Sequence, residues 1–107
     1  MEWFTICSVD DLQKDAGVCA LVNHKQVAIF FINEKTYAIS NFDPFGKANV
    51  LCRGIIGDVK GQIVVASPLY KQHFVLETGV CLEDESVILP VYANRIENGT
   101  VQIGVTS

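Results

Sequence analysis

The sequence predicts an all-β fold, a small antiparallel β-sandwich or barrel. Short runs of β-branched and aromatic residues recur along the 107 residues, and Gly, Pro, Asn and Asp interrupt them roughly every eight to twelve residues, as turns do in all-β proteins. Hydrophobic residues make up 50% of the chain and charged residues 19%, so enough apolar surface is available to offset the entropy of ordering the chain. This length suits one compact domain, which we expect over residues 1–107.

The N-terminal half is expected to begin with a strand at residues 3–8 (WFTICS). A one-turn helix should follow at residues 8–12, because the Ser8 hydroxyl can accept from an amide of the first turn and Asp10 and Asp11 favour that turn electrostatically. Strands at residues 17–22 and 26–33 are joined by Asn-His-Lys, and residues 35–41 pair back after Asn-Glu-Lys. These three strands predict a meander.

The C-terminal half contains β-type runs at residues 62–67, 73–79, 87–99 and 100–105. Asn98-Gly99 marks the clearest hairpin, because both residues tolerate the positive φ angles of a two-residue turn. Residues 42–61 and 67–72 lack such a pattern. We expect them to be loops on the β scaffold, where binding and catalytic residues tend to collect.

Charge and cysteine content argue against several classes of function. The net charge is −4 and Lys and Arg never form a run, which is unlike proteins that bind nucleic acid or an anionic membrane surface. No apolar stretch reaches the roughly 20 residues of a membrane helix, and the N-terminus lacks a signal-peptide pattern, so we expect a cytoplasmic protein. The four cysteines should then stay reduced, each as a small buried hydrophobic residue.

The two predicted loops open with similar phrases, Asp43-Pro44-Phe45 and Ser67-Pro68-Leu69-Tyr70. This frame, with the following HFVLETGVC, resembles Rieske [2Fe-2S] proteins, which carry Cys-x-His in the first loop and Cys-x-x-His in the second. On this frame the four ligand positions fall on Asp43, Phe45, Ser67 and Tyr70, none of which is Cys or His. The resemblance therefore implies a Rieske-like fold with vestigial cluster positions and no metal in this chain.

Without a cluster, the two loops need another clamp. Phe45, Leu69 and Tyr70 are expected to fill the space between the loops, because burying each such side chain is worth roughly 1.5 to 3 kcal/mol.

Four phrases resemble a narrower family: ISNFDPF, VLCRGIIGD, VASPLYKQ and GVCLEDE are similar to the small subunits of cytosolic bacterial NADH-dependent nitrite reductases. The resemblance implies a large-subunit partner that carries FAD, siroheme and an iron-sulfur cluster and reduces nitrite to ammonium with electrons from NADH. It also implies that this chain acts by binding and supplies no catalytic residue and no cofactor. Lys47, Arg53 and Lys71, on or beside the loops, are the candidate partner contacts.

Two other functions fit the residues and stay open at this point. The chain could be an electron-transfer protein that holds iron through unusual ligands. It could also be an independent small enzyme in which Cys52 acts as nucleophile and His73 as base, since such partners need be close only in space. The acidic residues 83–85 fit either a solvated loop or a docking patch.

Overall fold

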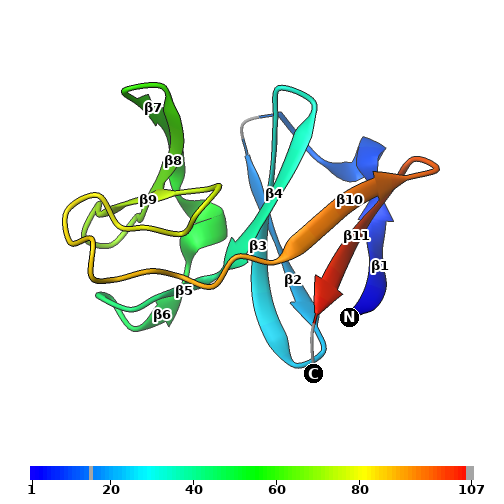
Figure 1. Ribbon diagram of the computed structural model, residues 1–107, viewed down its shortest axis with the longest axis horizontal. Coiled ribbons are helices and arrows are strands. Elements are labelled where there is room, and N and C mark those ends of the chain that lie inside the picture. Colours follow the sequence, from blue (N-terminus) through cyan, green and yellow to red (C-terminus); the bar gives the residue numbers. More distant parts are fainter. Residues whose placement is uncertain (15, 106–107) are drawn as a thin grey trace.

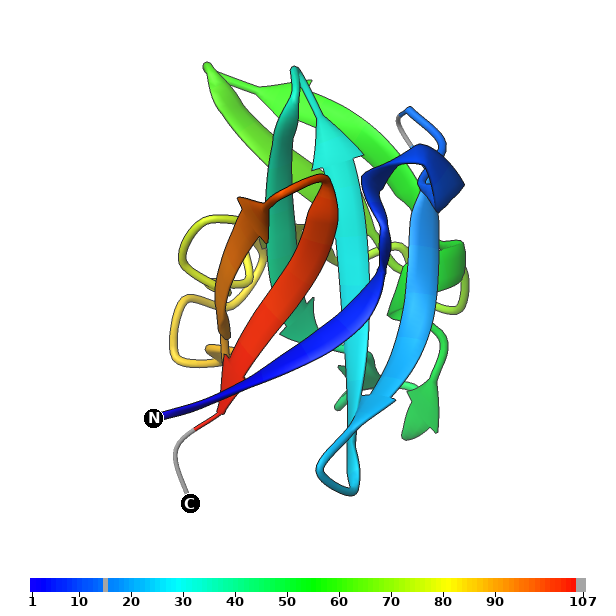
Figure 2. The ribbon, with the colours of Figure 1, turned by 90° about the vertical axis from the view of Figure 1, so that its right-hand side faces the viewer.

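The computed structural model describes residues 1–14 and 16–105, and Figure 1 shows its strands grouped in antiparallel sheets. The predicted domain of residues 1–107 thus includes three positions, 15, 106 and 107, that lie outside the described residues. The first sheet has the order β1-β11-β10, with β1 at Glu2–Ser8, β10 at Ala93–Glu97 and β11 at Thr100–Val105. Figure 2 shows β11 between its two neighbours, and Glu2 of β1 lies opposite Val105 of β11.

The second and third sheets come from consecutive strands. The second has the order β2-β3-β4, with β2 at Gly17–Val22, β3 at Lys25–Ile32 and β4 at Lys35–Ser40. The third has the order β7-β8-β9, with β7 at Ile55–Val59, β8 at Gln62–Ala66 and β9 at His73–Val75. A short ladder joins β5 at Phe42–Asp43 to β6 at Ala48–Asn49. The predicted meander of residues 17–41 is therefore confirmed.

Strand β3 lies between two hydrophobic cores. Val27 and Ile29 point into one core, shared with β11, whereas Ala28 and Phe30 point into the other, shared with β8 and β9. All four side chains are fully buried. Figure 1 shows the corresponding arrangement, with β2, β3 and β4 between the sheet of β1, β10 and β11 and the part of the chain that carries β5 to β9. Burial on both faces explains why β3 is a continuous apolar run rather than an alternating one.

Four hairpins close through two-residue turns in which both residues have positive φ angles. The turns are Asn23-His24, Asn33-Glu34, Lys60-Gly61 and Asn98-Gly99. Such turns match the right-handed twist of the flanking strands. The hairpin predicted at Asn98-Gly99 is confirmed.

The predicted one-turn helix is also present, as the 3-10 helix η1 at Val9–Asp11. The Ser8 hydroxyl accepts from the amide of Asp10 at 3.2 Å, which is the predicted cap. The second helix, η2, spans Leu51–Arg53. Within residues 1–14 and 16–105, no helix is long and apolar enough to cross a membrane.

The predicted loop of residues 42–61 is wrong over much of its length. It contains β5, β6, η2 and the whole of β7. Gly57 and Asp58 have poor strand propensity, so the sequence does not predict β7. In the structure β7 pairs with β8, in register from Ile55–Ala66 to Val59–Gln62. Tertiary pairing therefore overrides local preference here.

Two strands were predicted too long. The run at residues 73–79 is a strand only over His73–Val75 and then turns over residues 76–78. The run at residues 87–99 is a strand only over Ala93–Glu97, preceded by isolated bridges at Ile88 and Val91. The run does not form one strand because its pairing partner changes, from Val80 at Ile88 to Ile39 at Val91 and then to β11.

Candidate functional site

The first loop begins with a turn built by Asp43. Its Oδ1 accepts from the amides of Phe45 at 2.8 Å and Gly46 at 3.2 Å, and its carbonyl accepts from the amide of Lys47 at 2.7 Å. Lys47 has a φ of 55°. Asp is suited to this position because its short carboxylate can satisfy amides two and three residues ahead.

The second loop repeats this design with Ser67. Its Oγ accepts from the amide of Leu69 at 3.3 Å, and its carbonyl accepts from the amide of Lys71 at 3.1 Å. Lys71 has a φ of 62°. Each loop therefore consists of a capping side chain, a proline and, four residues after the cap, a lysine in the left-handed region.

The two capping side chains hydrogen-bond to each other across the loops. The Ser67 hydroxyl donates to Oδ2 of Asp43, and the two residues are 1% and 0% exposed. A second contact lies beside this bond, because a Cβ atom at Gly46 would overlap the Leu69 side chain. The structure thus brings together two of the four predicted vestigial positions, and a buried polar pair joins the loops.

The aromatic clamp predicted between the loops is wrong for Tyr70. Tyr70 is 66% exposed, and Leu69 is 45% exposed. Phe45, by contrast, is partly buried against the core, with the centre of its ring 6.2 Å from that of the Phe74 ring. The Asp43–Ser67 hydrogen bond is not predicted by the resemblance to Rieske proteins, which identifies these residues only as replaced ligand positions. The available signal was that each precedes a proline and belongs to a residue type that caps turns.

We expect Phe45→Ala to lower the free energy of unfolding by about 1.5 to 3 kcal/mol, because Phe45 buries its ring against Phe74. Tyr70→Ala is the matched control in the other loop, with an expected change within about 0.5 kcal/mol because its side chain is exposed. Urea denaturation measures both values. Equal losses in the two variants would contradict this assignment.

Asn41, at the end of β4, also positions the first loop and was not predicted. Its side chain is 1% exposed; Nδ2 donates to Gln26 at 3.2 Å and to the Cys19 thiol at 3.3 Å, and Oδ1 accepts from the amide of Cys52 at 2.7 Å. Its carbonyl accepts from the amide of Leu51 at 3.1 Å. Asn41 therefore ties η2 to the second sheet.

The three candidate contact residues Lys47, Arg53 and Lys71 are exposed. Lys47 and Lys71 occupy equivalent positions in the two loops, and Arg53 ends η2. None of the three forms an ion pair within the described residues. Their charges are thus free to meet a partner.

His73 and Cys52 have different partners. The imidazole Nδ1 of His73 lies 2.7 Å from Oε2 of Glu83, and the His73 amide donates to Oε1 of Glu83 at 2.6 Å. Cys52 instead lies beside Cys19. The geometry therefore gives no support to a Cys52–His73 catalytic pair.

The Glu83 carboxylate gives a prediction on pH. Partial burial raises its pKa, but the hydrogen bonds and charge of His73 outweigh burial, so the pKa lies below its ordinary value of 4.5. A carboxylate whose pKa is lower in the folded chain than in the unfolded chain stabilises the fold at pH values above its unfolded-state pKa. This stabilisation is lost as the pH falls through the folded-state pKa. We expect Glu83→Gln to lose less stability than the unmodified chain in urea denaturation between about pH 5 and about pH 3. The exposed neighbour Glu85→Gln is the control, and an identical acid response in all three proteins would contradict the assignment.

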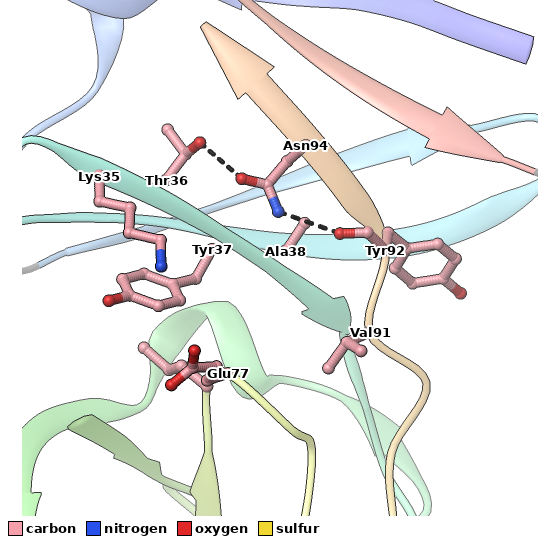
Figure 3. A pocket seen from close by; sticks show the side chains of 9 residues that line it. Lys35, Thr36, Tyr37, Ala38, Glu77, Val91, Tyr92 and Asn94 are labelled. Carbon is pink, nitrogen blue, oxygen red and sulfur yellow. Dashed lines mark hydrogen bonds between the residues drawn. The ribbon is translucent and has the colours of Figure 1, made fainter. Parts of the chain in front are cut away.

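A pocket of about 230 Å³ lies between β4 and the segments around Glu77 and Val91. Figure 3 shows two hydrogen bonds in its lining: Thr36 donates to Asn94 at 2.7 Å, and Asn94 donates to the Tyr92 carbonyl at 3.0 Å. The Lys35 ammonium lies 5.1 Å from the centre of the Tyr37 ring. Of these contacts, the Thr36–Asn94 hydrogen bond joins β4 of the second sheet to β10 of the first.

Comparisons with known proteins decide the family. The model of the Rieske-like [2Fe-2S] domain matches residues 2–104. The nitrite reductase (NADH) small subunit of Escherichia coli K12 is 45% identical over 104 residues, which cover 95% of this chain and 96% of that protein. The chain belongs to the nitrite reductase (NADH) small-subunit family.

Solved structures place this small-subunit family among Rieske-like folds. The nitrite reductase [NAD(P)H] small subunit of Erwinia carotovora is 46% identical, with a TM-score of 0.82 over 98% of this chain and 82% of that one. The ferredoxin of carbazole 1,9a-dioxygenase from Nocardioides aromaticivorans is only 17% identical, yet has a TM-score of 0.87 over 99% of this chain and 100% of that one. The second likeness shows the fold alone, and the predicted all-β Rieske-like fold is confirmed.

A segment of a larger protein is also similar to this small-subunit chain. The nitrite reductase [NAD(P)H] large subunit of Klebsiella oxytoca is 36% identical over 102 residues, which cover 95% of this chain and 11% of that protein.

The residues of this small-subunit chain do not fit a Rieske [2Fe-2S] cluster, which needs two thiolates and two imidazoles. Asp43 and Ser67 are buried and already bind each other and backbone amides. Phe45 has no donor atom, and Tyr70 offers only a phenol on an exposed side chain. Within residues 1–14 and 16–105, no three His, Cys, Asp or Glu residues are grouped to hold a metal ion.

Proposed function

We propose that this chain is the small, cluster-free subunit of an NADH-dependent nitrite reductase and that it acts by binding the large subunit. The observation that carries the proposal is the buried Asp43–Ser67 hydrogen bond, which joins the loops at two of the positions where a Rieske protein would place cluster ligands. The loops are thus held in place without a redox group. The family membership supports the reaction class.

The partner is supported by the Klebsiella oxytoca large subunit, part of which is similar to nearly the whole of this chain. A domain attached covalently has a high effective concentration near its neighbour, whereas a separate chain has to recognise that neighbour through a surface. The proposal assigns FAD, siroheme and an iron-sulfur cluster to the large subunit, and places the complex in the cytoplasm. It assigns the reduction of nitrite to ammonium to those cofactors and no catalytic residue to this chain.

We assign the docking surface to the two loops, defined here by Phe42, Lys47, Leu69, Tyr70 and Lys71, with Arg53 beside them. Phe42, Leu69 and Tyr70 are 41%, 45% and 66% exposed, and the lysines stand at equivalent places in the loops. An apolar centre that includes a tyrosine, surrounded by charges, is typical of protein interfaces. This surface fits an acidic rim on the large subunit.

Affinity capture from a soluble extract of nitrite-grown cells tests the function. The chain should retain a large protein whose absorption spectrum has flavin and siroheme bands, and NADH-dependent nitrite reduction should fall when the chain is removed. Capture of the chain alone, with nitrite reduction unaffected, would overturn the proposed function.

Titration with the purified large subunit tests the docking surface. Tyr70→Ala should weaken binding by about tenfold or more, and Lys47→Glu with Lys71→Glu should slow association and change its salt dependence. Lys25→Glu, an exposed lysine at the start of β3, is the matched control. Normal binding by the loop variants would show that the docking surface lies elsewhere, without contradicting the proposed function.

A further inference from the structure

Cys19 and Cys52 approach each other from different elements. Cys19 lies on β2 and Cys52 in η2, 33 positions later in the chain. The backbone of η2 lies directly against β2, because a Cβ atom at Gly17 would be 3.0 Å from the Cα of Cys52. Gly17 and Cys19 are two residues apart on one strand and therefore face the same side.

Asn41 holds the two cysteines in this arrangement. Its Nδ2 donates to the Cys19 thiol at 3.3 Å, and its Oδ1 accepts from the Cys52 amide at 2.7 Å. The Asn41 side chain is 1% exposed, so its position is fixed by the surrounding structure. One buried side chain thus contacts both cysteines.

The surroundings of the Cys19 thiol include Cys52 and Arg53. Partial burial raises the pKa of Cys19, the charge and hydrogen bonding of Cys52 raise it further, and the Arg53 guanidinium partly opposes them. Both thiols are free in the structure, Cys19 exposed and Cys52 half-buried. The expectation that every cysteine is a buried small residue is therefore wrong for Cys19 and holds for Cys81, which is fully buried. Cys19 is therefore accessible to a small reagent, and Cys52 is the less exposed of the two.

We propose that Cys19 and Cys52 form a modification site for low-molecular-weight disulfides such as oxidised glutathione. In the first step the Cys19 thiolate attacks one sulfur of the small disulfide, forming a mixed disulfide and releasing one thiolate. In the second step the Cys52 thiolate attacks the Cys19 sulfur and releases the second small thiol. The two cysteines are oxidised to a Cys19–Cys52 disulfide while the small disulfide is reduced to two thiols. This site goes beyond the proposed function and does not depend on it.

Exchange with oxidised glutathione, used as the probe on the folded, fully reduced chain, tests the site. After acid quenching and alkylation of free thiols, mass spectrometry should find a chain that has lost two hydrogens and carries alkylated Cys7 and Cys81. Digestion without reduction should yield one linked pair of peptides, containing Cys19 and Cys52. A chain that keeps all four thiols, or that stops at a stable mixed disulfide on Cys19, would overturn the proposal.

Two variants separate the steps. Cys52→Ser should accumulate one glutathione on Cys19, because the second step has lost its nucleophile. Cys7→Ser is the matched control and should form the Cys19–Cys52 bond as the unmodified chain does. Links that involve Cys7 or Cys81 to a similar extent would overturn the claim that the fold selects this pair.

Thermal unfolding decides whether the bond forms within the native fold. A cross-link between residues 19 and 52 restricts the unfolded chain, so the oxidised protein should have a Tm higher by roughly 10 °C. A lower Tm after oxidation would show that the bond forms only in a distorted chain and would overturn the proposal.

Discussion

Gly79→Ala is expected to lower the free energy of unfolding by about 3 to 4 kcal/mol. Gly79 has a φ of +82°, which disfavours any side chain. A Cβ atom there would also overlap the carbonyl oxygen of Leu89 and lie 3.0 Å from its carbonyl carbon. These segments cannot simply separate, because the Leu89 amide donates to Gly79 at 2.8 Å and the Gly79 amide donates to Val75 at 2.7 Å.

Gly99→Ala is the matched control for this prediction. Gly99 has nearly the same φ, +76°, but no atom lies within 4 Å of the Cβ position. Its substitution should therefore cost only the backbone strain, about 1 to 2 kcal/mol. Urea denaturation of both variants isolates the contribution of the Gly79–Leu89 approach. Equal losses would show that this approach adds nothing beyond the backbone angle.

Asp43→Ala is expected to lower the free energy of unfolding by about 3 kcal/mol, because it leaves buried or half-buried donors without an acceptor. Asp43 accepts from two amides of its own loop and from the Ser67 hydroxyl of the other, so one change affects both loops. Asp43→Asn is the conservative control. It keeps the Oδ1 acceptor and the shape of the side chain, and should lose less.

A double-mutant cycle tests whether the two loops are coupled through this bond. Asp43→Ala and Ser67→Ala, combined, should be less destabilising than the sum of the two single changes by about 1 kcal/mol, because either change already removes the shared hydrogen bond. Additive losses would mean that each side chain serves only its own turn. The loops would then be joined chiefly by apolar contacts such as that between Gly46 and Leu69.

The sequence predicts the fold best where a turn has a specific backbone requirement. Asn98-Gly99 and the two Asn-led turns of the meander each place two residues at positive φ, and the strands between them follow. The failures have physical causes as well. Strand β7 depends on pairing with β8 rather than on its own residues, and the run at residues 87–99 is divided because its pairing partner changes along its length.

The candidate site was predictable in place but not in its interactions. The resemblance to Rieske proteins placed Asp43 and Ser67 at the two loops, but the sequence does not show that side chains 24 positions apart share a hydrogen bond. The same holds for Asn41, whose partners come from β2, β3 and η2. Polar pairs of this kind form where segments that are distant in the sequence come together in the fold, and a local sequence pattern does not show this.

Strand β3 has a consequence for how the molecule opens. Its alternate side chains belong to two different cores, so displacement of β3 would disrupt both cores at once. The amides of β3 should accordingly be the slowest to exchange with deuterium and should do so only through global unfolding. The loops that carry Asp43 and Ser67 lie on one side of this strand and β11 on the other. We therefore expect the regions on the two sides of β3 to unfold as a single cooperative unit.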